Sequence, residues 1–160
     1  CNFDFSDSKC KFYRSVNSIF SKVGISNNEN VLLSLVSCFC KPVLTYGLEA
    51  MCLNKSAVVK LANTYNRAYC KIFQTFDKNI IKNCLYFCGY LPFEYDIIYK
   101  KLSFFYKIQN ADSNVVYSLF SSFGSKESEL LCNVYEISAG DSLGYMKFKL
   151  FEHFKLSLNA

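Results

Sequence analysis

Helix-breaking residues are scarce in this chain. Its 160 residues include two prolines, Pro42 and Pro92, and six glycines, so few positions force a break in secondary structure. Hydrophobic residues make up 51% of the chain and aromatic residues 18%, a share that excludes a disordered polypeptide. A chain of this length can also bury a core as one domain. Long helices around a core rich in phenylalanine and tyrosine are therefore the expected fold.

Helix caps and breakers set the expected boundaries. Gly24 suits the position just after a helix, Asn54 suits the N-cap of a long one, and Pro92 suits a first helical turn. The residue before Pro42 is expected to leave helical geometry, so the next segment is either a kinked continuation or a separate short helix. The expected helices span residues 9–24, 28–40, 42–53, 55–76, 79–87, 92–109, 115–120 and 145–158. Short turns between them predict an all-α fold, an antiparallel helical bundle.

The pattern is weaker after residue 110. Residues 121–125 predict a turn or linker, and residues 127–137 fit either a helix or a strand. We therefore divide the chain into a leader (1–8), a helical domain (9–110) and a C-terminal extension (111–160) that is α or mixed in class.

Positive charge is concentrated in the first part of the chain. Residues 1–110 hold fourteen Lys and Arg against seven Asp and Glu, whereas residues 111–160 hold four against six, which gives the net charge of +5. A positive surface attracts phosphate backbones without reading their sequence. Many soluble domains carry a similar net charge for solubility, so its placement matters more than its size.

Two of the expected helices carry their cations on one face. The polar face of the first helix presents Lys11, Arg14, Ser18 and Lys22. Its opposite face presents Phe12, Val16, Ile19, Phe20 and Val23. The helix of residues 55–76 has an apolar stripe of Leu61, Tyr65, Ala68 and Ile72. Beside that stripe runs a polar face with Lys60, Thr64, Arg67 and Lys71.

The spacing of these cations matches a nucleic-acid backbone. Side chains one helical turn apart lie about 5–6 Å from each other, close to the spacing of successive phosphates along one strand. An ordinary solvated surface is the alternative explanation for each face. Two such faces in one small domain make nucleic acid a candidate partner, which the resemblance described below favours further. The candidate backbone contacts are Lys11, Arg14, Lys22, Lys60, Arg67 and Lys71.

Four short motifs follow one another between residues 9 and 109. The first is the basic, aromatic run Lys11-Phe-Tyr-Arg14-Ser-Val-Asn-Ser-Ile-Phe20. The second is Pro42-x-x-x-Tyr46-Gly47-x-Glu49, and the third is Asn66-Arg67 followed by Lys71-Ile-Phe73. The fourth is Cys84-x-x-Phe87-x-Gly89-x-x-Pro92. In this order and spacing they resemble the region just downstream of the polymerase palm in reverse transcriptases of non-LTR (LINE-type) retrotransposons.

The resemblance implies a fragment of an RNA-directed DNA polymerase, the thumb-like helices that grip the template–primer duplex without the fingers and the catalytic palm. Its partners would be an RNA/DNA template–primer duplex and the missing part of the parent polymerase, which would use Mg²⁺. The first basic helix and the face with Arg67 and Lys71 would contact the duplex backbone. Its location would be intracellular, in the cytoplasm, the nucleus or both.

The carboxylates that such a polymerase needs for catalysis are missing from the sequence. Two-metal polymerases hold their ions with paired carboxylates, and this chain has no two adjacent acidic residues. Asp4 and Asp7 precede the first expected helix and are interpreted as loop acids, with Asp7 or Ser8 as an N-cap. His153 is the only histidine and is expected at the surface. We therefore assign no catalytic residue and no cofactor to this chain, and expect no activity from it alone.

Nine cysteines raise the question of a metal site or of disulfides. Their spacings, such as Cys38-x-Cys40 and Cys84-x-x-x-Cys88, do not match the usual zinc patterns. Most are expected in the core, where a free thiol acts as a small apolar side chain. Without a secretory signal they indicate a reducing compartment.

Two alternatives remain open from the sequence. Residues 31–53 are mostly apolar and approach the roughly 20 residues that span a bilayer, but Lys41, Pro42 and Glu49 favour buried core helices and no membrane partner. The function could also be that of a helical protein-interaction domain with no nucleic-acid role, or the chain could be an inactive remnant.

Overall fold

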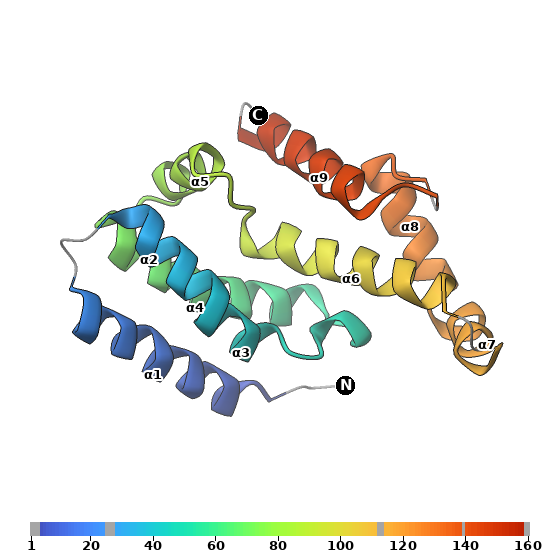
Figure 1. The fold of residues 1–160 in the computed structure, drawn as a ribbon, viewed down its shortest axis with the longest axis horizontal. Coiled ribbons are helices and arrows are strands. Elements are labelled where there is room, and N and C mark those ends of the chain that lie inside the picture. The colour runs from blue at the N-terminus through green and yellow to red at the C-terminus, as the bar shows by residue number, and fades with distance from the viewer. Residues whose placement is uncertain (1–3, 25–27, 112–113, 139, 159–160) are drawn as a thin grey trace. The chain divides into compact units, whose positions relative to one another are not determined.

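The computed structural model describes residues 4–24, 28–111, 114–138 and 140–158. Every regular element in these ranges is helical, which confirms the all-α class (Figure 1). The α-helices are α1 Ser6–Val23, α2 Glu29–Leu35, α3 Lys41–Thr45, α4 Lys55–Phe73, α5 Lys78–Phe87, α6 Phe93–Gln109, α7 Asn114–Phe123, α8 Ser125–Tyr135 and α9 Leu143–Leu158. A π-helical turn, η1 (Val36–Cys40), joins α2 to α3, and a 3-10 turn, η2 (Leu48–Ala50), follows α3.

The chain divides into two compact units, Cys1–Glu94 (unit 1) and Tyr95–Ala160 (unit 2). Along the chain, the division between the units falls at the start of α6. The division predicted from the sequence, after residue 110, follows the end of that helix and stays a prediction. By sequence, unit 1 holds eleven Lys and Arg against six Asp and Glu, and unit 2 holds seven of each. The whole net charge of +5 therefore lies in unit 1.

A chain of aromatic rings forms the centre of unit 1. The Phe12 ring of α1 lies 5.6 Å from the Tyr65 ring of α4, measured between centroids. Tyr65 in turn lies 4.8 Å from Tyr69 and 5.4 Å from Phe93. All four side chains are buried, and burying each contributes about 1.5–3 kcal/mol. The apolar stripes predicted for the two basic helices therefore face one core.

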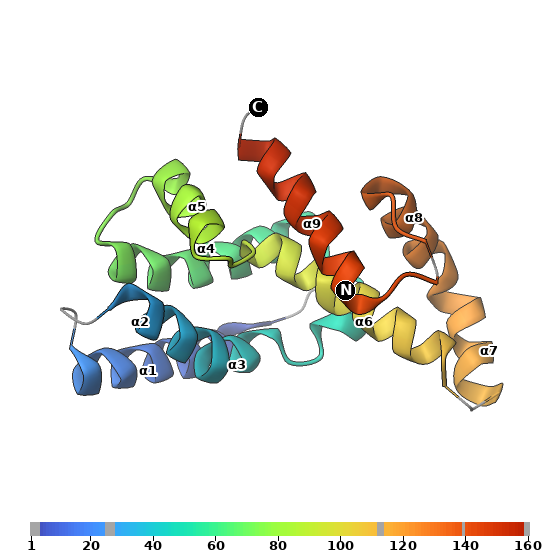
Figure 2. The same ribbon diagram turned by 45° about the horizontal axis from the view of Figure 1, so that its top comes forward.

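Helix directions in unit 1 follow from these contacts. Phe12 contacts Tyr65, and five residues further along α1 the Asn17 side chain bonds to Lys71, so α1 and α4 run in the same direction. The continuous run from α2 to α3 returns in the opposite direction (Figures 1 and 2). Successive long segments thus alternate in direction, while α1 and α4 are parallel neighbours.

The helix passes through Pro42, so the predicted break before it is wrong. Lys41 has helical angles, with φ −56° and ψ −43°. The η1 turn is wider than an α-helix because the Lys41 N–H donates to the Val36 carbonyl, five residues back. We attribute the tolerance of Pro42, which lacks an N–H and crowds the preceding turn, to this wider bonding pattern.

The helix predicted for residues 42–53 is wrong beyond Thr45. Tyr46 is extended, with ψ 125°, and Gly47 is left-handed, with φ 73°. Only the short η2 turn follows before α4 begins. The left-handed conformation is easy for glycine and ends the helix.

Side-chain caps set the first residues of α4 and α5. Oδ1 of Asn54 accepts from the Ala57 N–H at 2.7 Å, which confirms the predicted start of α4. The helix ends at Phe73 rather than at 76, because Gln74 is left-handed with φ 50°. Asp77 then caps α5, where its Oδ1 accepts from the Asn79 N–H at 2.8 Å.

Unit 2 has its own core of α6, α7, α8 and α9. The Phe105 ring of α6 lies 5.5 Å from Phe120 of α7, and the Tyr95 ring lies 5.6 Å from Phe154 of α9. Buried Lys101 forms an ion pair with Glu127 of α8.

The sequence leaves helix and strand open for residues 127–137, and the structure has a helix there, α8. The turn predicted for residues 121–125 is wrong, because α7 continues to Phe123 and only Gly124 separates it from α8.

The expectation that most cysteines lie in the core is wrong. Among the eight that the structure describes, all unpaired, only Cys40 is buried. Cys10, Cys38 and Cys52 are exposed, and the others are half-buried. Cys38 lies in the wider η1 turn and Cys52 in the irregular segment after η2, where α-helical periodicity does not place side chains.

Within the described residues, no helix is both long and apolar enough to span a membrane. In residues 31–53 the apolar side chains of Leu32, Leu33, Val36 and Leu44 are buried in unit 1.

Candidate nucleic-acid interface

The predicted cations of α1 all lie on its exposed side. Lys11, Arg14 and Lys22 are exposed, while Phe12 and Val16 are buried. Lys11 is partly neutralised, because its Nζ lies 2.7 Å from Oδ2 of Asp7, one turn away. Such an exposed pair contributes at most about 1 kcal/mol, so Lys11 stays available to other anions.

Asp7 is therefore neither a loop acid nor an N-cap, as predicted, but a residue of the first turn of α1. The helix begins at Ser6, earlier than expected, where Oδ1 of Asp4 accepts from the Ser6 backbone N–H at 2.9 Å. Hydrogen bonds from the Ser6 side chain and backbone lower the pKa of Asp4.

The cations of α4 form a ridge along one side of the helix. Lys60, Arg67 and Lys71 are exposed. At 1.5 Å rise per residue, Arg67 lies about 10 Å beyond Lys60 and about 6 Å before Lys71. The sequence predicts Thr64 on the same polar face, but its side chain is buried, and its hydroxyl donates to the Lys60 carbonyl at 3.0 Å. The hydroxyl is thus satisfied inside the helix.

The ridge of α4 lies along the seam with α1. The Lys71 Nζ donates to Oδ1 of Asn17 at 2.8 Å and lies 5.7 Å from the centre of the Phe20 ring. On the helical wheel of α1, Arg14 is 60° from Asn17, whereas Lys11 and Lys22 are more than 100° away. Arg14 is therefore the α1 cation nearest to the ridge of α4, while Lys11 and Lys22 lie on the far side of α1.

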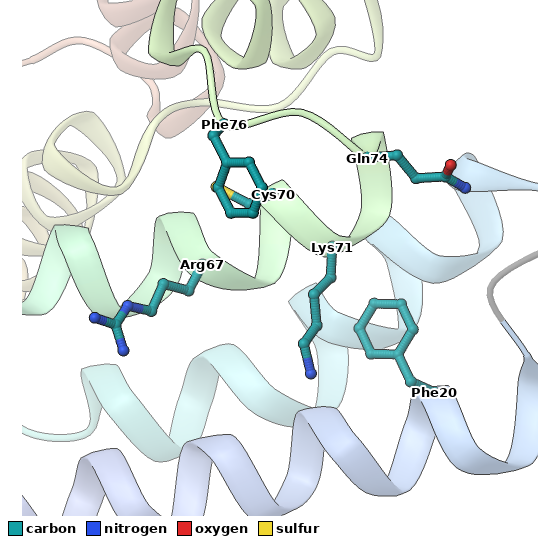
Figure 3. Close-up of a pocket in the computed structure, with 6 residues that line it drawn as sticks. All are labelled: Phe20, Arg67, Cys70, Lys71, Gln74 and Phe76. Carbon is teal, nitrogen blue, oxygen red and sulfur yellow. The ribbon is translucent and has the colours of Figure 1, made fainter.

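A groove of about 870 Å³ opens at the end of this seam (Figure 3). Phe20 reaches it from α1, and the other lining residues come from α4 and from the turn after it. The described lining residues are Phe20, Arg67, Cys70, Lys71, Gln74 and Phe76. Of the predicted site residues, the groove therefore brings Arg67 and Lys71 together.

The site residues predicted from the sequence do not include Phe76, Cys70 or Gln74. Phe76 was expected as the last residue of a helix, but it lies in the turn with 91% of its surface exposed. The signal that could have found it is Asp77, an N-cap residue that places Phe76 just outside the next helix.

The groove is electropositive. Its described lining residues include two cations and no carboxylate. Within the described residues, no carboxylate lies within ion-pair distance of Lys60, Arg67 or Lys71. The carbonyls at the C-terminal end of α4 carry partial negative charge, which Lys71 in the last turn offsets. The arrangement therefore suits an anion beside Arg67 and Lys71.

The other side of α4 carries a smaller and more mixed cavity. It has a volume of about 240 Å³ and lies between α4 and α5, where Asn66 lines it together with Lys78, Lys82 and Glu94. The adjacent residues of the Asn66-Arg67 motif therefore border different cavities. The carboxylate of Glu94 makes this second cavity less suited to an anion.

No metal centre emerges from the described residues, since they contain no group of three His, Cys, Asp or Glu side chains that could hold an ion. His153 is exposed, as predicted, with its Nδ1 3.1 Å from the Tyr95 hydroxyl. Its ring packs edge-on against Tyr135, whose pKa is raised by burial and by Tyr95. These aromatic contacts give His153 a structural role in unit 2.

Comparison of the chain with models of protein families, with curated proteins and with solved structures finds no match.

Proposed function

We propose that unit 1 grips a nucleic-acid duplex by its backbone, in the way the thumb-like segment of a non-LTR reverse transcriptase grips its template–primer duplex. The observation that carries this proposal is the exposed ridge of Lys60, Arg67 and Lys71 on α4, for which the described residues provide no ion-pair partner. Arg14 on the neighbouring side of α1 extends the same positive surface. The resemblance of residues 9–109 to the region downstream of the polymerase palm supports the assignment to this class.

The contribution of these residues is electrostatic positioning. Lysine and arginine side chains on phosphates fix the orientation of a duplex and carry no sequence information. Three such contacts predict that log K falls with log salt with a slope of about −2.7. A fourfold rise in salt should then weaken binding roughly 40-fold. By holding the duplex in register, these residues would favour repeated nucleotide addition by the parent enzyme. They would take no part in the chemical step.

The chemistry would belong to the rest of the parent polymerase. Its palm would supply the paired carboxylates and the Mg²⁺ ions that stabilise the attacking and leaving oxygens. The partners of this chain would be an RNA/DNA template–primer duplex and the missing fingers and palm. It would act in the cytoplasm, the nucleus or both.

Fluorescence anisotropy of the 160-residue chain with a labelled RNA–DNA hybrid, at about 50 and 200 mM salt, tests the proposal. Replacing Arg67 and Lys71 with alanine should weaken binding similarly for any duplex sequence and reduce the magnitude of the salt slope by about 2. The matched control replaces Lys147 and Lys155, two exposed lysines of α9, and removes the same charge from unit 2. Equal binding by the wild type and the Arg67/Lys71 variant would overturn the proposal.

The exposed apolar side chains of α5 favour a second function, that of a helical protein-interaction domain. Ile80 and Phe87 lie two turns apart on one side of the helix, and Phe87 is 83% exposed. An apolar interface of this kind does not weaken as salt rises, whereas duplex binding does. Salt-independent capture of a protein partner without duplex binding would support this alternative, and no binding of either kind would indicate an inactive remnant.

A further inference from the structure

The groove at the end of the α1–α4 seam combines exposed aromatic surface with positive charge. Phe76 is 91% exposed and lies in a short turn between α4 and α5. Gln74 holds the left-handed end of α4, and the side chain of Asp77 caps α5. The turn therefore leaves a large apolar ring exposed to solvent, where it adds little to the stability of the fold.

The charges of the groove define the chemistry of its occupant. Arg67 has a planar guanidinium that binds phosphate through two parallel hydrogen bonds. Lys71 donates a hydrogen bond to the side-chain amide of Asn17. Because this amide is neutral, the contact leaves the positive charge of Lys71 uncompensated. The same ammonium lies over the Phe20 ring and holds it at the groove. An occupant with a negative group at Arg67 and Lys71 and a flat apolar part beside Phe76 matches these side chains.

Unpaired nucleotides of a strand have this combination of phosphate and flat ring. A volume of about 870 Å³ lies in the range of pockets for small ligands, so the groove suits individual nucleotides rather than a paired helix. Proteins that bind single strands combine a positive groove for the backbone with aromatic side chains on which bases stack. The groove has both components: Arg67 and Lys71 lie on α4, and the ring of Phe76 follows the end of that helix (Figure 3).

We propose that this groove binds the unpaired nucleotides of a strand that extends beyond the duplex, with phosphate at Arg67 and Lys71 and a base stacked on Phe76. The inference rests on the proposed function, because the same two cations serve the duplex grip. It adds that the occupant of the groove is single-stranded and that base stacking contributes to its affinity.

Three labelled hybrids with the 160-residue chain separate stacking from backbone contact. The first is blunt, the second carries a short single-stranded extension, and the third carries an extension of the same length without bases. The extension with bases should bind at least about fivefold more tightly than the abasic one. Phe76→Ala should remove this gain, and Phe76→Tyr should keep it.

The matched control is Phe87→Ala, which removes a similarly exposed aromatic side chain from the far end of α5, outside the described lining of the groove. It should leave all three affinities unchanged. Because Phe76 makes little contact with the core, its replacement should also leave the thermal unfolding midpoint unchanged. The inference would be overturned if the extensions with and without bases bound equally tightly. It would also be overturned if Phe76→Ala bound the extension with bases as tightly as the wild type does.

A thiol measurement gives an independent readout, because Cys70 lines the groove. The extension with bases should slow alkylation of Cys70 relative to the exposed Cys38 and Cys52. The abasic extension should protect Cys70 less, and equal protection by both would count against stacking.

The outcomes also separate this inference from the duplex grip. If the Arg67/Lys71 variant loses every hybrid while Phe76→Ala binds like the wild type, the groove inference fails and the duplex grip stands. If only the extension with bases is bound, and Phe76 is needed for it, the groove inference stands and the duplex grip fails. Absence of binding to all three hybrids at about 50 mM salt overturns both.

Discussion

Cys40 is the one buried thiol among the described cysteines. It closes the η1 turn, and its side chain is fully inaccessible in unit 1. Burial disfavours the charged thiolate and raises the pKa of Cys40 to about 11, from a usual value of 9.0. Because the folded pKa is the higher one, folding favours the protonated thiol. The resulting contribution to stability is present below about pH 9 and is lost as the pH rises through about 11.

Replacing Cys40 with alanine removes this titration. We expect the wild type to lose up to about 2 kcal/mol relative to Cys40→Ala between pH 9 and about pH 11, and nothing relative to it below pH 9. Urea unfolding of both proteins over this pH range measures the difference, and titrations common to both cancel. Cys52→Ala, at an exposed position, is the control and should show no such trend. A difference that stays constant to pH 11 would contradict the prediction.

At the scale of elements, the sequence predicts a boundary well where one side chain makes it. Asn54 starts α4 as expected, and Gly89, with φ 75°, follows the predicted end of α5. Prediction fails where bonding within the helix satisfies an apparent breaker. Pro42 is accommodated by the η1 turn, and Ser121 lies inside α7, where its hydroxyl is satisfied by the Ser118 carbonyl at 2.9 Å. Neither bonding pattern can be recognised from the residue types, so the sequence predicts a helix break at both positions.

The N-cap of α4 is the element-scale feature with the clearest energetic consequence. Asn54→Ala leaves the Ala57 N–H without its side-chain acceptor, and we expect it to destabilise unit 1 by about 1 kcal/mol. Chemical denaturation followed by circular dichroism measures the change. Asn83→Ala, at an exposed position inside α5, is the control and should be neutral or slightly stabilising, because alanine is the better helix former. Equal losses for the two variants would argue against a specific role of the cap.

At the scale of the whole molecule, charge distinguishes the two units. Helical periodicity predicts the exposure of Lys60, Arg67 and Lys71, since all three lie on a polar face beside the apolar stripe of α4. It does not predict the groove, which needs Phe20 from α1 beside residues of α4. That pairing depends on the contact between Phe12 and Tyr65, which are distant in sequence. The cations of the candidate site were therefore predictable, whereas the cavity that brings two of them together was not.

The charge difference between the units predicts which helices a bound duplex protects from amide hydrogen exchange. With a saturating RNA–DNA hybrid, amide hydrogen exchange should slow in α1 and α4 and stay unchanged in α8 and α9, because ligand binding stabilises the segments that it contacts. Mass spectrometry of peptic fragments measures both sets in one experiment. The Arg67/Lys71 double variant should show no slowing. Slower exchange confined to unit 2 would place the duplex interface there and contradict the prediction.

The buried position of Phe93 limits how the protein can be dissected. This residue opens α6, yet its ring is fully buried against Tyr65. A truncated protein that ends at residue 92 would leave a ring-sized cavity among the aromatic side chains, at a cost of about 3–5 kcal/mol. An isolated unit 1 made for spectroscopy or crystallisation must therefore carry part of α6, long enough for its first turn not to fray.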